Sequence, residues 1–239
     1  MNIAIPIKNR IHLLAVICSL LIPFLGNAQK ETVSGVAREV QKNYSDHYYQ
    51  RLELFQGEDV APGAIVFLGN SITEGGNWKA LFPKRPVVNR GISGDVTDGI
   101  LNRIGEVTAL QPDKIFLLVG TNDLARGKRV EYVVSGVKAI VEALQQASAD
   151  TRIYVQSILP VNPMVGDRFS GHKANSQKIL EANARLEQLA KAMAVEFIDL
   201  HKAMRDRKGY LKAGYTYDGL HLSEAGYVRW KQVVKKQLK

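Results

Sequence analysis

Cysteine is nearly absent from this 239-residue chain, in which Cys18 is the only one. Cys18 lies in an N-terminal segment that we expect to be removed, so the mature chain is expected to offer no disulfide, cysteine nucleophile or thiolate metal site. The sequence also lacks the patterns G-x-S-x-G, G-x-x-x-x-G-K-[ST], G-x-G-x-x-G and H-E-x-x-H. These absences leave α/β-hydrolase, nucleotide-binding and zinc-peptidase interpretations without support.

No apolar run is long enough to predict a membrane-spanning helix. The longest, residues 11–25, is shorter than the roughly 20 residues that a span requires. Lys8 and Arg10 precede it, and small residues ending at Ala28 follow it, which is the pattern of a cleavable signal peptide. We therefore expect residues 1–28 to be a signal peptide and the mature protein to be periplasmic or secreted, without stable membrane insertion.

The remaining residues, 29–239, are enough for one domain. The full chain carries a net charge of +9, and its basic residues are mostly scattered among acidic ones. This pattern is typical of a solvated surface and argues against nucleic-acid binding. The sequence does not predict the oligomeric state.

Strand patterns alternate with helical patterns along the mature chain. An N-terminal extension, 29–62, is expected to be helical over 33–56. Apolar, β-rich runs then predict five short strands at 65–68, 87–89, 114–119, 152–158 and 195–200. Helical spacing between and after them, clearest at 130–147 and 175–193, favours one α/β domain with a parallel sheet covered by helices on both faces.

Ser71 follows the most apolar of these strands. Residues 65–68 are apolar without interruption, as in a central parallel strand, and Gly69 and Asn70 then suit a tight turn. Because such sheets bind ligands at the carboxyl ends of their strands, the Ser71 hydroxyl is expected to face that crevice. The alternative is a turn in which the serine only caps a helix.

An Asp-x-x-His pair lies just before the last predicted helix. This spacing lets Asp218 accept a hydrogen bond from one ring nitrogen of His221, which leaves the other nitrogen free to take a proton from a serine. A simple helix-entry turn is the alternative. The other histidines have no evident partner in the sequence and are expected to be surface or capping residues, or part of the signal peptide: His12, His47, His172 and His201.

A serine hydrolase also needs donors for the developing oxyanion. Gly91 has no side chain to block its backbone N–H, and Asn122 offers a side-chain amide; both follow predicted strands. The backbone N–H of Ser71 would be the third donor.

Four segments together resemble the SGNH (GDSL-type) hydrolase family, in order and in approximate spacing. They are Gly69-Asn70-Ser71-Ile72, Asn89-Arg90-Gly91, Gly120-Thr121-Asn122-Asp123 and Asp218-Gly219-Leu220-His221. The first three look most like the platelet-activating-factor acetylhydrolase-like branch. Asn70 departs from the usual aspartate, but it can make much the same turn hydrogen bonds.

This resemblance implies a flavodoxin-like, three-layer α/β/α sandwich with a five-stranded parallel sheet. It also implies Ser71 as nucleophile, His221 as base and Asp218 as the acid that orients the histidine. Gly91 and Asn122 would form the oxyanion hole with the Ser71 amide. No metal or other cofactor is expected.

We therefore expect an exported serine esterase that removes short acyl groups, most simply acetyl, from a small-molecule or glycan ester. The polar and aromatic residues Asn77, Trp78 and 210–217 are expected to flank a sugar, with plain packing as the alternative. A lysophospholipase or other lipid acylhydrolase is the second hypothesis. A catalytically silent glycan-binding protein is the third.

Overall fold

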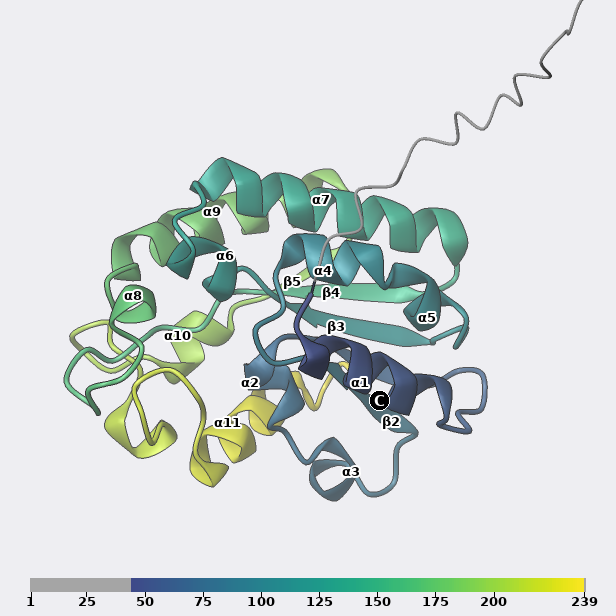
Figure 1. Ribbon diagram of the computed structural model, residues 1–239, viewed down its shortest axis with the longest axis horizontal. Coiled ribbons are helices and arrows are strands. Elements are labelled where there is room, and N and C mark those ends of the chain that lie inside the picture. The colour runs from purple at the N-terminus through teal and green to yellow at the C-terminus, as the bar shows by residue number, and fades with distance from the viewer. Residues whose placement is uncertain (1–43, 239) are drawn as a thin grey trace, which may run out of the picture. The chain divides into compact units, whose positions relative to one another are not determined.

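The computed structural model describes residues 44–238 of the chain, so the predicted signal peptide and the first part of the predicted extension lie outside the described residues. Five parallel strands form one sheet: β1 (Ile65–Gly69), β2 (Val87–Gly91), β3 (Lys114–Leu118), β4 (Arg152–Gln156) and β5 (Glu196–Ile198). Their order is β2-β1-β3-β4-β5 (Figure 1). This is the flavodoxin-like order, which confirms the predicted fold.

Helices of very different lengths precede, connect and follow these strands. They are α1 (Asp46–Gln56), α2 (Ser71–Glu74), α3 (Trp78–Leu81), α4 (Thr97–Asn102), α5 (Ile104–Thr108), α6 (Thr121–Ala125), α7 (Val130–Ala147), α8 (Ser170–Lys173), α9 (Ser176–Ala192), α10 (Leu200–Met204) and α11 (Glu224–Val234), with a 3₁₀ turn at Ala213–Tyr215. Figure 1 shows α7 and α9 on one side of the sheet and α11 on the other. Among residues 44–238, no helix is both long and apolar enough to cross a membrane.

The strand order places β1 at the point where the chain reverses direction across the sheet. From β1 the chain goes to β2 on one side, and it then returns to β3 on the other. Every residue of β1 and β3 is buried, because helices cover both faces. The chain therefore leaves β1 and β3 at neighbouring points of the carboxyl-terminal rim, where Ser71 begins α2 and Asn122 lies in α6.

One face of the sheet carries a row of aromatic rings. Phe67, Phe116 and Tyr154 occupy paired positions on β1, β3 and β4, and neighbouring ring centroids lie 5.0 and 4.6 Å apart. Trp78 stacks on Phe67 at 3.7 Å, and Trp230 of α11 meets the edge of Trp78 at 4.8 Å. These contacts anchor the segment after α2 in the core.

Several predicted boundaries differ from the structure. The described part of the N-terminal helix begins at Asp46, because Ser45 caps it by accepting a hydrogen bond from Tyr48 N–H. The strand predicted at 152–158 ends at Gln156, and the one predicted at 195–200 is only three residues long. The short helices α6, α8 and α10 were not predicted, since four or five residues are too few to show a helical period.

Candidate active site

Ser71 is the first residue of α2, and Asn70 alone separates it from the end of β1. The buried Asn70 caps this helix, because its Oδ1 accepts the Ile72 N–H at 3.0 Å. Asn70 thus makes the turn hydrogen bond expected of it from the sequence. A Cβ on Gly69 would lie 2.3 Å from the Leu118 carbonyl oxygen, so the turn has room only for glycine there.

The structure brings Ser71, His221 and Asp218 together. His221 Nε2 lies 3.0 Å from Ser71 Oγ, and His221 Nδ1 lies 2.7 Å from Asp218 Oδ2. Asp218 Oδ1 also accepts the backbone N–H groups of Leu220 and His221, at 2.9 and 2.7 Å. The carboxylate therefore fixes both the ring and the backbone of the histidine, and the Nδ1–H tautomer leaves Nε2 free to accept from the serine.

The environment of Asp218 keeps it ionised. Burial raises its pKa, but the hydrogen bonds from the His221 ring and from the Leu220 and His221 amides outweigh burial and hold the pKa below its ordinary value. The loop requires glycine at position 219: Gly219 has a φ of +87°, and a Cβ there would lie 2.3 Å from the Asn162 carbonyl oxygen. The charged carboxylate can thus stabilise an imidazolium at His221.

Asn122 is held on both sides of its amide group. Its Nδ2 donates to the Asp95 carbonyl at 2.8 Å, and its Oδ1 lies 2.9 Å from His172 Nε2. An amide NH₂ carries two hydrogens, so one of them remains for another acceptor. Asn122 lines the same pocket as Ser71, and the Ser71 backbone N–H donates to no acceptor among residues 44–238.

Gly91 does not serve as the third donor, contrary to the sequence prediction. Its N–H donates to Asn89 Oδ1 at 2.9 Å, and a Cβ on Gly91 would lie 2.1 Å from the Glu74 nitrogen. Gly91 is therefore a position where β2 and α2 approach closely. Gly94, three residues later, lines the pocket with Ser71 and Asn122.

The backbone of Gly94 is suited to the role predicted for Gly91. Gly94 has a φ of +80°, and its N–H makes no hydrogen bond with any group of the described chain. Its carbonyl accepts from Arg126 Nη2 at 2.7 Å, which fixes the peptide on its other side. Both glycines belong to the segment GISGD, so the sequence pointed to this loop, and of the two glycine amides in it the one left free in the described chain is that of Gly94.

His172 is a site residue that the sequence prediction missed. It lies on α8, lines the pocket and bonds Asn122, although the two residues are 50 positions apart in the chain. Burial lowers its pKa, and the neighbouring His221 and Arg126 lower it further. A neutral ring with its proton on Nε2 donates to Asn122 Oδ1. No local sequence signal links these two positions.

Asn77 and Trp78 do not reach the site, so the prediction that they flank a substrate is wrong. Trp78 is only 1% exposed, stacks on Phe67 and donates its ring N–H to the Thr73 carbonyl at 2.9 Å. Asn77 caps α3 by accepting the Ala80 N–H at 3.2 Å. Both side chains therefore stabilise the backbone of α2 and α3.

The pocket beside Ser71 measures about 500 Å³. Two aromatic rings flank His221: the Phe169 ring meets it edge-on, with ring centroids 5.0 Å apart, and the Tyr217 ring lies nearly parallel to it, with ring centroids 6.0 Å apart. Phe169 adopts a left-handed backbone, with φ +63°, which is rare for a bulky residue and occurs most often at functional sites. Tyr217 is 66% exposed.

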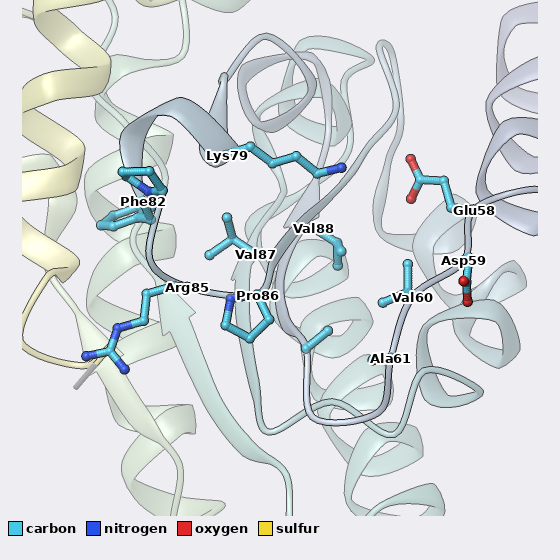
Figure 2. Close-up of a pocket in the computed structure, with 12 residues that line it drawn as sticks. Glu58, Asp59, Val60, Ala61, Lys79, Phe82, Arg85, Pro86, Val87 and Val88 are labelled. Carbon is cyan, nitrogen blue, oxygen red and sulfur yellow. The ribbon is translucent and has the colours of Figure 1, made fainter.

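A second cavity, of about 490 Å³, lies where β2 begins, at the end of that strand opposite to the catalytic rim. Glu58 and Asp59 form one wall, and Lys79 and Arg85 form another (Figure 2). Its lining contains no serine or histidine, so it lacks the groups needed for acyl transfer. Within the described residues, no three His, Cys, Asp or Glu side chains are grouped to hold a metal ion.

Comparisons with known proteins agree with this geometry. The sequence model of the GDSL-like lipase/acylhydrolase family matches residues 67–229. The platelet-activating factor acetylhydrolase IB subunit alpha1 of Bos taurus is 30% identical over 174 residues, which cover 68% of this chain and 69% of the relative.

Two solved structures are similar as well. A protein from Streptococcus pneumonia, described as a candidate platelet activating factor, is 34% identical with a TM-score of 0.72, over 80% of this chain and 91% of that one. A GDSL-like lipase from Bacteroides thetaiotaomicron is 26% identical with a TM-score of 0.69, and the match covers 80% of this chain and 96% of that one. The resemblance inferred from four short motifs is confirmed: this chain belongs to the GDSL-like lipase/acylhydrolase family and is a carboxylic ester hydrolase.

Proposed function

We propose that the protein is a serine esterase in which Ser71 is the nucleophile, His221 the base and Asp218 the acid that orients the base. One observation carries this proposal: Ser71 Oγ, the His221 ring and the Asp218 carboxylate form an unbroken chain of hydrogen bonds of 3.0 and 2.7 Å. A serine hydroxyl is a weak nucleophile at neutral pH unless such a base takes its proton.

The reaction follows from these positions. Ser71 Oγ attacks the ester carbonyl carbon while His221 Nε2 takes the hydroxyl proton. The imidazolium, stabilised by Asp218, then protonates the leaving alcohol, and an acyl-enzyme remains on Ser71. Water, deprotonated by His221, attacks this acyl-enzyme and releases the carboxylic acid and the free serine.

The oxyanion formed in both steps needs donors on the opposite side of the carbonyl from His221. The Ser71 amide, the Gly94 amide and the second N–H of Asn122 are the donors we assign. Each lines the pocket, and none of the three hydrogens is used by another group among residues 44–238. Donors held in place before the reaction stabilise the transition state most, because they do not need to reorganise.

We propose an acetyl or similarly short acyl group, carried on a carbohydrate, as the substrate. The name of the mammalian relatives, acetylhydrolase, supports the short acyl group. The exposed ring of Tyr217 and the ring of Phe169 support a carbohydrate, because they flank His221, which must protonate the leaving alcohol. The apolar C–H face of a sugar ring can lie on such an aromatic surface.

A lipid alcohol is the second candidate. The same relatives are named for a platelet-activating factor, and the same aromatic pair could contact an alkyl chain. The two candidates share the acyl group and differ in the alcohol. Substrates that vary the acyl chain and the alcohol separately therefore distinguish them.

With p-nitrophenyl esters, we expect kcat/KM to fall at least about tenfold between butyrate and octanoate, since the proposed substrate carries a short acyl group. Acetate release should then be faster from acetylated oligosaccharides than from an acetylated lysophospholipid. Rates that rise toward decanoate would overturn the short-chain assignment. Faster acetate release from the lipid would favour the second candidate.

We also propose that the protein is exported, on the strength of the basic, apolar and small residues in order over residues 1–28. Expression of the full chain in a Gram-negative host should give a periplasmic or secreted protein whose N-terminal sequence starts at Gln29. A product that keeps Met1 and stays in the cytoplasm would refute export and would leave the esterase proposal untouched.

A further inference from the structure

Glu74 is a half-buried acid near the site that the proposed mechanism does not use. It is the last residue of α2, the single-turn helix that Ser71 begins. Its side chain is 19% exposed, and its carboxylate Oε2 accepts the backbone N–H of Ser93. The other carboxylate oxygen, Oε1, lies 3.0 Å from His47 Nε2 and 3.6 Å from Arg51 Nε.

The hydrogen bond between Ser93 and Glu74 lies next to a proposed oxyanion donor, the Gly94 amide. Ser93 immediately precedes Gly94, so the Glu74 carboxylate holds the peptide just before the Gly94 amide. Gly94 itself is exposed and has a left-handed backbone, and its carbonyl is held only by the exposed Arg126. Since Ser71 and Glu74 are one helical turn apart, this bond fixes the Gly94 amide relative to the nucleophile.

Glu74 is ionised in this position. Burial raises its pKa, but the hydrogen bonds from Ser93 and His47 outweigh burial and keep the pKa below its ordinary value. A hydrogen bond from an amide to a charged carboxylate is roughly twice as strong as one to a neutral acceptor. The contact therefore adds to the hydrogen bond from Asp95 N–H to the Ile92 carbonyl, at 3.1 Å, that closes this turn.

The two basic side chains beside Glu74, His47 and Arg51, come from α1. This helix precedes residues 67–229, the part of the chain that matches the family model. Tyr48 fixes it by donating from its hydroxyl to the Gly99 carbonyl at 2.8 Å, and the Arg90 guanidinium lies 4.5 Å from the centre of the Phe55 ring. Arg51 also donates from Nη2 to the Gly91 carbonyl at 3.3 Å, at the end of β2.

We propose that Glu74, held in place by His47 and Arg51 of α1, is a positioning residue that sets the Ser93–Gly94 turn for oxyanion stabilisation. Through these two contacts, α1 supports the active site. This inference rests on the proposed serine mechanism, in which Gly94 donates to the oxyanion.

Glu74→Ala should lower kcat for p-nitrophenyl acetate about 10- to 100-fold, with KM changed less than about twofold, because a misplaced donor acts mainly in the transition state. Glu74→Gln should fall between the wild type and Glu74→Ala, since its amide oxygen can still accept from Ser93 but its neutral side chain no longer attracts Arg51. Labelling by a fluorophosphonate should slow in parallel for Glu74→Ala, because phosphonylation develops charge at the same donors.

Glu131→Ala is the matched control, because Glu131 forms an exposed ion pair with Arg185 on the far helices α7 and α9. It should leave kcat unchanged. If Glu74→Ala does not fold, Glu74→Asp replaces it: this variant keeps the charge but withdraws the carboxylate from Ser93, and it should also lose kcat. The double variant His47→Ala/Arg51→Gln should lower kcat in the same direction.

The proposal fails if Glu74→Ala keeps kcat within twofold of wild type, if Glu74→Gln is as impaired as Glu74→Ala, or if the loss lies in KM alone. The folded fraction is checked by circular dichroism in each case. These outcomes are separate from a failure of the serine mechanism itself, which would appear as activity in Ser71→Ala whatever the Glu74 variants show.

Discussion

Ser71→Ala is expected to lower kcat for p-nitrophenyl acetate by at least about 1,000-fold, with the fold unchanged. Without Oγ no acyl-enzyme can form, and His221 and the oxyanion donors can only assist the direct attack of water. Labelling by a fluorophosphonate should disappear as well, because the probe bonds to the serine oxygen. Initial rates and gel fluorescence of the labelled protein measure the two effects.

A change in the protein's structure is not expected to cause this loss of activity. The Ser71 side chain makes only one hydrogen bond in the described chain, to His221. Circular dichroism and the thermal midpoint should therefore match wild type. Ser170→Ala is the control: Ser170 is exposed at the start of α8 and does not line the pocket, so its loss should not change the rate. Near-wild-type hydrolysis by Ser71→Ala would refute the serine mechanism, and intact labelling would place the reactive oxygen elsewhere.

The fold and the three triad positions could be predicted because both rest on local patterns. An uninterrupted apolar run such as 65–68 predicts a buried parallel strand, and such strands end on one rim. This rule alone places Ser71 and Asn122 together, although β2 lies between them in the chain. Asp218 and His221 are only three residues apart, so a single turn determines their contact.

The sequence predictions were wrong where the role of a residue depends on the contacts that it already makes in the folded protein. Gly91 and Gly94 are equivalent glycines in the sequence, but in the structure the Asn89 side chain occupies the Gly91 amide and only Gly94 of the two lines the pocket. Trp78 was assigned to the substrate because exposure is invisible in a sequence; its ring stacks on Phe67 in the core. Such distinctions require the tertiary structure.

For the same reason, the sequence did not reveal the residues that hold the proposed oxyanion donors in place. His172 contacts Asn122 from α8, and His47 contacts Glu74 from α1, the helix before β1. Each pair joins residues that no motif places together, at separations of 50 and 27 positions. Long-range polar contacts of this kind have no periodicity that a single sequence could reveal.

Asn122→Ala is expected to lower kcat about 100- to 1,000-fold with little change in KM, because its amide hydrogen acts on charge that develops only in the transition state. Alanine also removes the bonds to Asp95 and His172, so the shape of the site needs its own control.

Asn122→Asp supplies this control, because an ionised aspartate has the same shape as asparagine but only acceptors. It should be at least as slow as the alanine variant, since it places a negative charge beside the oxyanion. Stopped assays with p-nitrophenyl acetate over a range of concentrations separate kcat from KM for both variants. Retained activity in Asn122→Asp would show that the side chain does not donate to the oxyanion, and the Ser71 and Gly94 amides would then be the only donors left to stabilise it.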